Sequence, residues 1–269
     1  MFKTRLLSGV ILVLLAFILI IPGGEILVVS MGIISLIGMY ELYRVVQIEK
    51  KAPAIMAYIL AIIYYLNLYF NIFDSEMIFA IICIVFLMAV YVFTYPKYST
   101  EQMAVTFFGI FYVAVMLSYV YLTRCMNDGL YLVWLIFLCS WGADTSAYCV
   151  GVLIGKHKMS PKLSPKKSIE GAVGGIVGTM IFTYIFFMAF GGKMDMLEGN
   201  DTIKFVIISG VCAFVSMIGD LTASAIKRNY DIKDYGTLIP GHGGILDRFD
   251  SVIFIAPIVY YLIYYSVGR

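Results

Sequence analysis

The sequence predicts an all-α, polytopic membrane protein with about nine transmembrane helices, its N-terminus inside the cell and its C-terminus outside. Composition gives the first indication, because 62% of the 269 residues are hydrophobic and only 13% are charged. The mean hydropathy is +0.94. Apolar runs of about 20 residues, the length that crosses the hydrocarbon core as a helix, recur along the whole chain. Lys and Arg gather in alternate connecting segments, which gives the orientation.

Nine apolar segments are expected to form these helices. The first follows Lys3 and Arg5, and we interpret it as an uncleaved span because Pro22-Gly23-Gly24-Glu25 comes after it in place of a small-x-small cleavage site. The approximate limits of the nine segments are 5–22, 26–45, 53–73, 76–95, 103–123, 129–150, 171–190, 203–226 and 250–266.

The basic residues set the orientation. With the N-terminus inside, only four of the 19 Lys and Arg residues fall outside, so 15 (19 − 4) lie on the inner side. Cytoplasmic segments of membrane proteins carry such an excess. We therefore expect a multi-pass protein of the cell (inner) membrane, with the charge-rich segments 151–170 and 227–249 facing the cytoplasm. The four outer residues are Arg124, Lys193, Lys204 and Arg269.

The charge distribution also divides the chain. Residues 1–128 are mainly apolar spans and are expected to act as a scaffold. Residues 129–269 are expected to form a catalytic transmembrane region with cytoplasmic loops 151–170 and 227–249. The net charge of +2 is distributed by loop and not by patch, so no nucleic-acid partner is expected.

Four aspartates are candidate metal ligands. Asp144 and Asp220 lie inside predicted spans, where a carboxylate is costly and usually faces a cavity or a cation. Asp247 and Asp250 stand three residues apart around the start of the last span. Hard oxygen donors without a Cys or His cluster favour Mg²⁺, with Mn²⁺ as the alternative. A second cation can bind in addition. The competing interpretations are a helix-packing hydrogen bond for Asp144 and Asp220, and helix capping for Asp250.

Basic and glycine residues near these acids suggest phosphate binding. On an ideal helix Asp220, Ser224 and Lys227 share one face, with Arg228 beside them. The segment Gly241-His242-Gly243-Gly244 can approach a phosphate closely, and the less favoured interpretation of His242 is a solvated side chain. Lys166 and Lys167 belong to a lysine-rich loop whose alternative role is a topology anchor or an anionic-lipid contact.

The charged and glycine residues near the C-terminus form one long pattern, preceded by the segments Asp144-Thr145 and Ser164–Gly171. The residues of the C-terminal pattern are Ser224, Lys227, Arg228, Lys233, Asp234, Gly236, Pro240 to Gly244, Asp247, Arg248 and Asp250. On these residues the stretch 140–252 resembles the phosphatidate cytidylyltransferase (CDP-diacylglycerol synthase) family. Ala223 departs from the family's pattern, since many relatives have a glutamate there.

The resemblance implies that the chain is a nucleotidyltransferase that converts CTP and phosphatidate to CDP-diacylglycerol and pyrophosphate, with magnesium. A phosphate monoester has its second pKa near about 6, so it is a nucleophile at neutral pH without a strong general base. Catalysis then consists of positioning two anions and neutralising their charge. Together with the resemblance, this assigns catalysis to Asp220, Asp247, Lys227, Arg228 and Arg248, substrate binding to Lys166, Lys167, Ser224, Lys233, His242, Gly243 and Gly244, and metal binding to Asp220, Asp247, Asp250 and Asp144.

Two other functions compete with this one. A CTP-dependent lipid kinase would release CDP, and a transporter would also place carboxylates in spans but would spread them across the bilayer midplane. The expected partners are CTP, phosphatidate and membrane lipids. Spans rich in small residues, including Gly171-x-x-x-Gly175 and Gly174-x-x-x-Gly178, indicate close helix packing and suggest a homodimer.

Overall fold

The computed structural model describes residues 2–72, 75–195 and 201–267, and it is almost entirely helical. The predicted all-α class is confirmed. Within these ranges the two β-strands, β1 (Lys158–Ser160) and β2 (Ser164–Ser168), pair as an antiparallel hairpin. Within the described residues eight helices are long and apolar enough to cross a membrane, and a shorter apolar helix covers Leu7–Ile20. The count of nine spans and the N-in, C-out orientation remain predictions.

Contacts divide the chain into two compact units. The N-terminal unit comprises Met1–Tyr121 together with Asp234–Arg248, and the C-terminal unit comprises Leu122–Lys233 together with Phe249–Arg269. The glycine-rich segment before the last helix thus belongs with the N-terminal helices. The boundary between the units falls inside the last helix, between Arg248 and Phe249.

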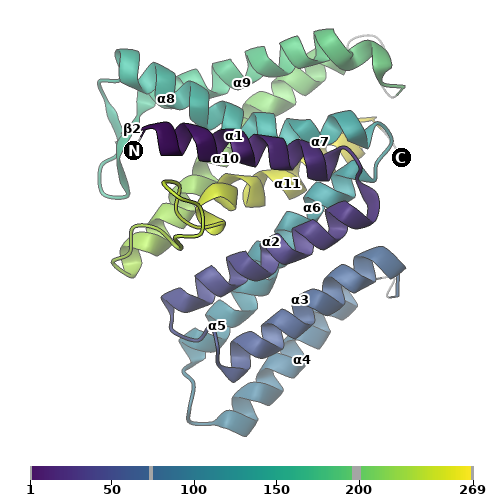
Figure 1. Ribbon diagram of the computed structural model, residues 1–269, viewed down its shortest axis with the longest axis vertical. Helices are drawn as coiled ribbons and strands as arrows, with labels where there is room; N and C mark the ends of the chain where they lie inside the picture. The colour runs from purple at the N-terminus through teal and green to yellow at the C-terminus, as the bar shows by residue number, and fades with distance from the viewer. Residues whose placement is uncertain (1, 73–74, 196–200, 268–269) are drawn as a thin grey trace. The chain divides into compact units, whose positions relative to one another are not determined.

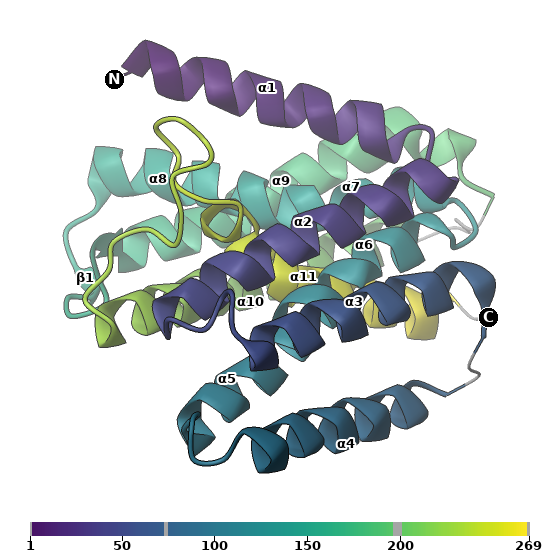
Figure 2. The same ribbon diagram turned by 60° about the horizontal axis from the view of Figure 1, so that its bottom comes forward.

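Six helical elements form the main part of the N-terminal unit. Tyrosine hydroxyls join them: Tyr65 bonds Ser35 at 2.7 Å, and Tyr43 donates to the Thr106 carbonyl at 2.7 Å. Figure 2 shows α2, α3 and α4 in succession along this unit. The elements are α1 (Phe2–Ile20), α2 (Gly24–Val45), α3 (Ala52–Phe70), α4 (Glu76–Thr94), α5 (Thr100–Gly109) and the π-helical η1 (Ile110–Val115), after which α6 (Met116–Arg124) continues the same span.

The C-terminal unit is built around a close pair of helices, α8 and α9, which lie side by side in Figure 1. Glycines on α9 permit this approach: a Cβ on Gly171 would lie 2.8 Å from the Ala147 carbonyl, and one on Gly175 would lie 3.1 Å from the Ala143 carbonyl. The elements are α7 (Gly129–Phe137), η2 (Leu138–Gly142), α8 (Ala143–Ile154), the hairpin, α9 (Ile169–Phe190), η3 (Gly191–Lys193), α10 (Asp201–Asn229) and α11 (Leu246–Val267), of which the part from Phe249 belongs to this unit.

The charge-rich segments are more ordered than the sequence suggested. The lysine-rich segment 151–170 contains the end of α8 and the β hairpin, in which Lys158 pairs with Ser168 and Ser160 with Ser164. The helix α10 continues to Asn229, so Lys227 and Arg228 lie in its last turn and not in a loop. Basic side chains there oppose the negative C-terminal end of the helix dipole. The last helix begins at Leu246, four residues before the expected start at 250.

Candidate active site

A cavity of about 480 Å³ lies in the C-terminal unit and is lined by two aspartates and three lysines. The α8 helix contributes Asp144, and α10 contributes Asp220. The hairpin contributes Lys158, Lys166 and Lys167. Hydroxyl and apolar groups complete the lining: Ala147, Tyr148, Gly151, Val152, Met159, Ser164, Ser168, Gly171, Ala172 and Met217. Acids and bases predicted from three separate stretches of sequence therefore meet in one cavity.

The acidic and basic sides of the cavity are joined by an ion pair. The Lys167 ammonium donates to Oδ2 of Asp220. The two side chains are 27% and 26% exposed, so the pair is partly shielded from water. A partly buried pair is screened less by salt than a surface pair. Lys167 thus places positive charge beside Asp220 inside the cavity.

Asp250 adds a third carboxylate to this group from α11. Its side chain is 6% exposed, and its Oδ1 accepts hydrogen bonds from the Ser251 N–H (2.8 Å) and from the Ser251 hydroxyl (3.4 Å). It interacts electrostatically with Asp220, Asp144 and Lys227. The structure therefore brings three of the four predicted acids and one predicted base together in the C-terminal unit.

The donor chemistry of these acids fits a hard divalent cation. Carboxylate oxygens are the ligands that Mg²⁺ prefers, and buried like charges are stabilised by a positive ion. Within the described part of the chain, however, no three His, Cys, Asp or Glu side chains close around a common point. The Lys167 ammonium supplies positive charge next to Asp220 in this arrangement.

The fourth predicted acid, Asp247, holds the glycine-rich loop of the N-terminal unit. Its Oδ2 accepts hydrogen bonds from the N–H groups of Tyr235 (2.8 Å) and Gly244 (3.0 Å), and its side chain is 5% exposed. Gly243 has a φ of +88°, and a Cβ there would lie 2.8 Å from that same oxygen. The glycine at 243 is therefore required both by the backbone conformation and by the close approach of Asp247.

A residue that sequence reasoning missed, Glu41 of α2, binds the start of α11. Its Oε1 accepts from the Ile245 N–H (3.1 Å) and its Oε2 from the Leu246 N–H (2.8 Å). Arg44, nearly one turn later, donates to the Tyr235 carbonyl at 2.5 Å. Glu41 is 4% exposed. The signal that could have found it is a carboxylate inside an apolar span, which usually has a partner.

His242 is held by the first helix of the N-terminal unit. The Ser8 hydroxyl lies 2.6 Å from His242 Nδ1 and donates to the Pro240 carbonyl at 3.2 Å. The two contacts hold the imidazole ring of His242 and the carbonyl of Pro240 against α1. His242 is therefore an oriented side chain and not a freely solvated one.

The remaining predicted site residues occupy less enclosed positions. Ser224 and Lys227 are half-buried on α10, and Arg248 is half-buried in the first turn of α11. Arg228 is exposed and donates to the Ile232 carbonyl at 3.3 Å, which joins the last turn of α10 to the segment after it. Lys233 is also exposed.

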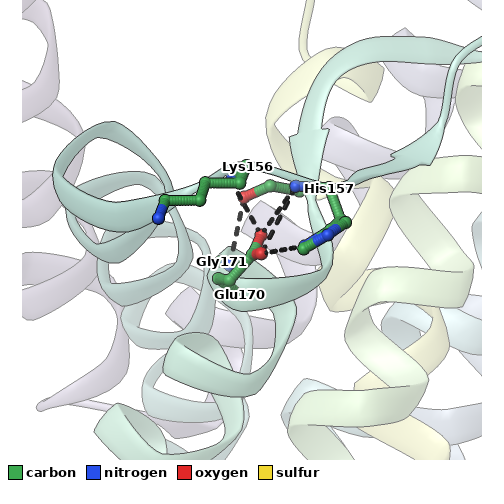
Figure 3. A network of polar contacts seen from close by, with 5 residues as sticks. Lys156, His157, Glu170 and Gly171 are labelled. Atoms are coloured by element: carbon green, nitrogen blue, oxygen red, sulfur yellow. Dashed lines mark hydrogen bonds and ion pairs between the residues drawn. The ribbon is translucent and has the colours of Figure 1, made fainter.

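A polar network fixes the base of the hairpin that carries the cavity lysines. Figure 3 shows Glu170 between Lys156 and His157. The Glu170 carboxylate accepts from the Lys156 N–H (3.0 Å), the His157 N–H (3.1 Å) and His157 Nδ1 (2.5 Å). Ser168 caps α9 by accepting from the Gly171 N–H at 3.1 Å. Both ends of the hairpin are thereby tied to the start of α9.

These features define a multi-pass membrane protein with an acid- and lysine-lined cavity, and comparison with known proteins gives its family. The sequence profile of the cytidylyltransferase family matches residues 3–266, so the chain belongs to this family of nucleotide-transferring enzymes. Phosphatidate cytidylyltransferase of Bacillus subtilis (strain 168) is 30% identical, with 97% of each chain covered. The proteins of the same name from Staphylococcus haemolyticus and Staphylococcus aureus (strain COL) are 32% and 30% identical, covering 96% and 98% of this chain and 97% and 100% of their own lengths.

Proposed function

We propose that the chain is a phosphatidate cytidylyltransferase, which converts CTP and phosphatidate to CDP-diacylglycerol and pyrophosphate. The proposal rests above all on the cavity of the C-terminal unit, which combines carboxylates and lysines from α8, the hairpin and α10. The relatives of that name match this chain over nearly its full length, and this supports the same conclusion.

The reaction joins two anions. An oxygen of the phosphatidate phosphate attacks the α-phosphorus of CTP, and the bond from that phosphorus to the oxygen bridging to the β-phosphorus breaks. Pyrophosphate leaves with the bonding electron pair. Lys166 and Lys167 hold substrate phosphates. Lys227, on α10, lowers the repulsion between CTP and phosphatidate. Each charge-assisted contact of this type contributes about 1.5–3 kcal/mol.

A divalent cation, magnesium or manganese, would be held by Asp220 and Asp250, with Asp144 beside them. Bound there, it would supply further neutralisation of phosphate charge. The electrostatic interaction of Asp250 with Asp220 and Asp144, which brings the three carboxyl groups together, supports this assignment. Asp247 fits the metal role less well, because its Oδ2 accepts two backbone N–H bonds in the glycine-rich loop. We assign Asp247 to the shape of that loop, in which the side chains of His242 and Arg248 remain phosphate-binding candidates. Gly243 and Gly244 then shape the loop, since the Gly244 N–H is bound by Asp247.

The proposed location is the cell (inner) membrane, with the cavity opening toward the cytoplasm, where CTP is made. The excess of basic residues on the inner side supports this orientation. Lipid substrate and product would remain in the bilayer throughout. The homodimer stays a prediction of the sequence, but the glycines of α9 do not support it, because Gly171, Gly174, Gly175 and Gly178 face α8 of the same chain.

One assay distinguishes the proposed reaction from its rivals. Purified full-length protein in detergent is given CTP labelled in the cytidine ring, phosphatidate and Mg²⁺, and the products are separated. We expect label in the lipid fraction and pyrophosphate in the aqueous fraction, both dependent on phosphatidate and on the cation. Release of labelled CDP would establish a lipid kinase instead. Binding of CTP without any product would leave the transferase proposal without support.

A further inference from the structure

We infer that Glu41 and Arg44, both on α2, are positioning residues for the proposed cytidylyl transfer. They hold the segment Tyr235–Leu246 and the first turn of α11 in one conformation. That segment and turn carry two side chains predicted to bind phosphate, those of His242 and Arg248. The predicted Gly244 could bind phosphate only through its backbone N–H, and that group is bound by Asp247. The inference rests on the proposed function, and it gives the N-terminal helices a part in the reaction beyond that of a scaffold.

The contacts place Glu41 where a bound anion would otherwise lie. The first N–H groups of a helix have no partner within the helix and attract anions. At α11 three successive N–H groups are taken by carboxylates of the chain itself: Gly244 by Asp247, and Ile245 and Leu246 by Glu41. A glycine-rich loop before a helix usually suggests a backbone phosphate cradle, but this cradle is filled by Asp247 and Glu41. Substrate phosphates must then be held by side chains, whose positions depend on the loop.

The loop is shaped to admit Glu41. A Cβ on Gly236 would lie 2.7 Å from Cδ of Glu41, and a Cβ on Gly244 would lie 2.5 Å from the same atom. Both distances are too short for a real side chain. The two glycines therefore provide the space in which the carboxylate sits.

Arg44 closes the other end of the same segment. Arg44 donates to the Tyr235 carbonyl, and the Tyr235 N–H donates to Asp247. Tyr235 is 1% exposed, so both of its backbone groups are paired away from water. The segment is thus fixed at Tyr235 by Arg44 and at Ile245 and Leu246 by Glu41.

A positioning role and a general structural role give different kinetics. If a variant merely reduces the fraction of folded enzyme, the apparent kcat falls and the KM values of both substrates stay the same. If the loop shifts in a folded enzyme, the side chains that hold phosphate are misplaced and a KM value rises. The separation of KM from kcat therefore tests the inference.

The test compares Glu41→Ala, Glu41→Gln and Arg44→Ala with Glu25→Ala. Glu25 is a second carboxylate on α2; it is exposed and accepts from the Tyr69 hydroxyl, so it is the control for the loss of a carboxylate from the same helix away from the loop. Each full-length protein is purified in detergent, its folded fraction is measured by size exclusion and thermal unfolding, and kcat and both KM values are determined. Loss of a charge-assisted contact predicts a rise of roughly tenfold or more in the KM of at least one substrate for Glu41→Ala and Arg44→Ala.

Glu41→Gln should fall between Glu41→Ala and the unchanged protein, because a carboxamide offers one acceptor oxygen where the carboxylate offers two. Glu25→Ala should leave both KM values within about twofold of the original. KM values within twofold for the folded Glu41 and Arg44 variants would overturn the inference, whatever happens to kcat. If Glu41→Ala does not fold, Glu41→Gln and Arg44→Ala are judged by the same criterion. Failure of the unchanged protein to make CDP-diacylglycerol would instead refute the proposed function.

Discussion

Asp220 is the residue at which the acidic and basic sides of the cavity meet, since it lies on α10 and pairs with Lys167 of the hairpin. Changing Asp220 to Asn preserves the size of the side chain but removes its charge. We expect cytidylyl transfer to fall by roughly 10²-fold or more, as for the loss of other preorganised electrostatic groups in active sites. Activity is measured on purified protein across a magnesium titration.

Asp231→Asn is the matched control for this change. Asp231 is an exposed aspartate with a φ of +51°, a conformation that asparagine adopts readily. The cytidylyl transfer activity of the Asp231→Asn variant should be unchanged. Near-normal turnover and an unchanged magnesium requirement in Asp220→Asn would contradict the assignment of Asp220 to the metal site.

Lys167 provides a second test on the basic side of the cavity. Lys167→Ala removes the ammonium that pairs with Asp220 and leaves that carboxylate partly buried without it. We expect kcat/KM to fall roughly ten- to a hundredfold, which corresponds to the loss of one charge-assisted contact. Lys97→Ala, in which the lost ammonium lies over the Tyr98 ring, should have little effect. Equal, small effects for the two variants would indicate that the hairpin lysines serve only as topology anchors.

The sequence could predict part of this residue-level picture. Asp144 and Asp220 are predicted because carboxylates inside apolar segments need a partner. Asp250 is predicted from its place, with Asp247, around the start of the last span, and the structure groups it with Asp144 and Asp220. Glu41 could not be predicted as part of the loop, because its partner Leu246 lies 205 residues away and no local pattern links the two. Asp247 was noticed for its charge, but the use of its Oδ2 by Tyr235 and Gly244 depends on the fold of the loop.

At the scale of elements, the contact between α8 and α9 sets the walls of the cavity. Gly174 of α9 faces Val150 of α8, and a Cβ at Gly174 would lie 2.5 Å from the Val150 Cβ. Val150 is β-branched and has little rotamer freedom in a helix, so the helices would have to separate. Gly174→Ala should therefore destabilise the protein by about 1–3 kcal/mol, the usual cost of overpacking.

The control for this prediction is Gly192→Ala, since a Cβ at Gly192 would meet nothing within 4 Å. Its stability should change by less than about 0.5 kcal/mol. Both variants are compared by denaturant unfolding in the same detergent. Equal stability of the two variants would show that α8 and α9 tolerate a wider separation.

Element types were easier to predict than their irregularities. Apolar length identified the long helices, but two π-helical segments, Ile110–Val115 and Leu138–Gly142, have no counterpart in the hydrophobic pattern. Such segments often occur at functional sites, and Leu138–Gly142 directly precedes the turn that carries Asp144. The hairpin was also missed, because its Pro- and Lys-rich strands have low β-propensity and are held by Glu170 and Ser168.

At the scale of the whole molecule, the predicted orientation of the chain in the membrane can be tested by cysteine labelling. Exposed native thiols are first removed by changing Cys125 and Cys149 to Ser. A cysteine is then introduced at Lys162, in the turn between the strands, or at Gly192. An impermeant thiol reagent added to intact cells should label the Gly192 variant and leave the Lys162 variant unlabelled until the cells are opened. The reverse pattern would place the hairpin, and with it the cavity, outside the cell.

The long separation between Glu41 and Leu246 has a consequence for biogenesis. The ribosome makes Glu41 early and adds 205 more residues before its partner exists. At about 5–20 residues per second, that interval is on the order of 10–40 s (205 divided by the rate). During this time α2 has entered the bilayer with a carboxylate that lacks its final partners, so the insertion machinery or nearby water must accommodate the charge. A nascent chain interrupted before residue 245 would lack the Ile245 and Leu246 N–H groups that bind this carboxylate in the folded protein.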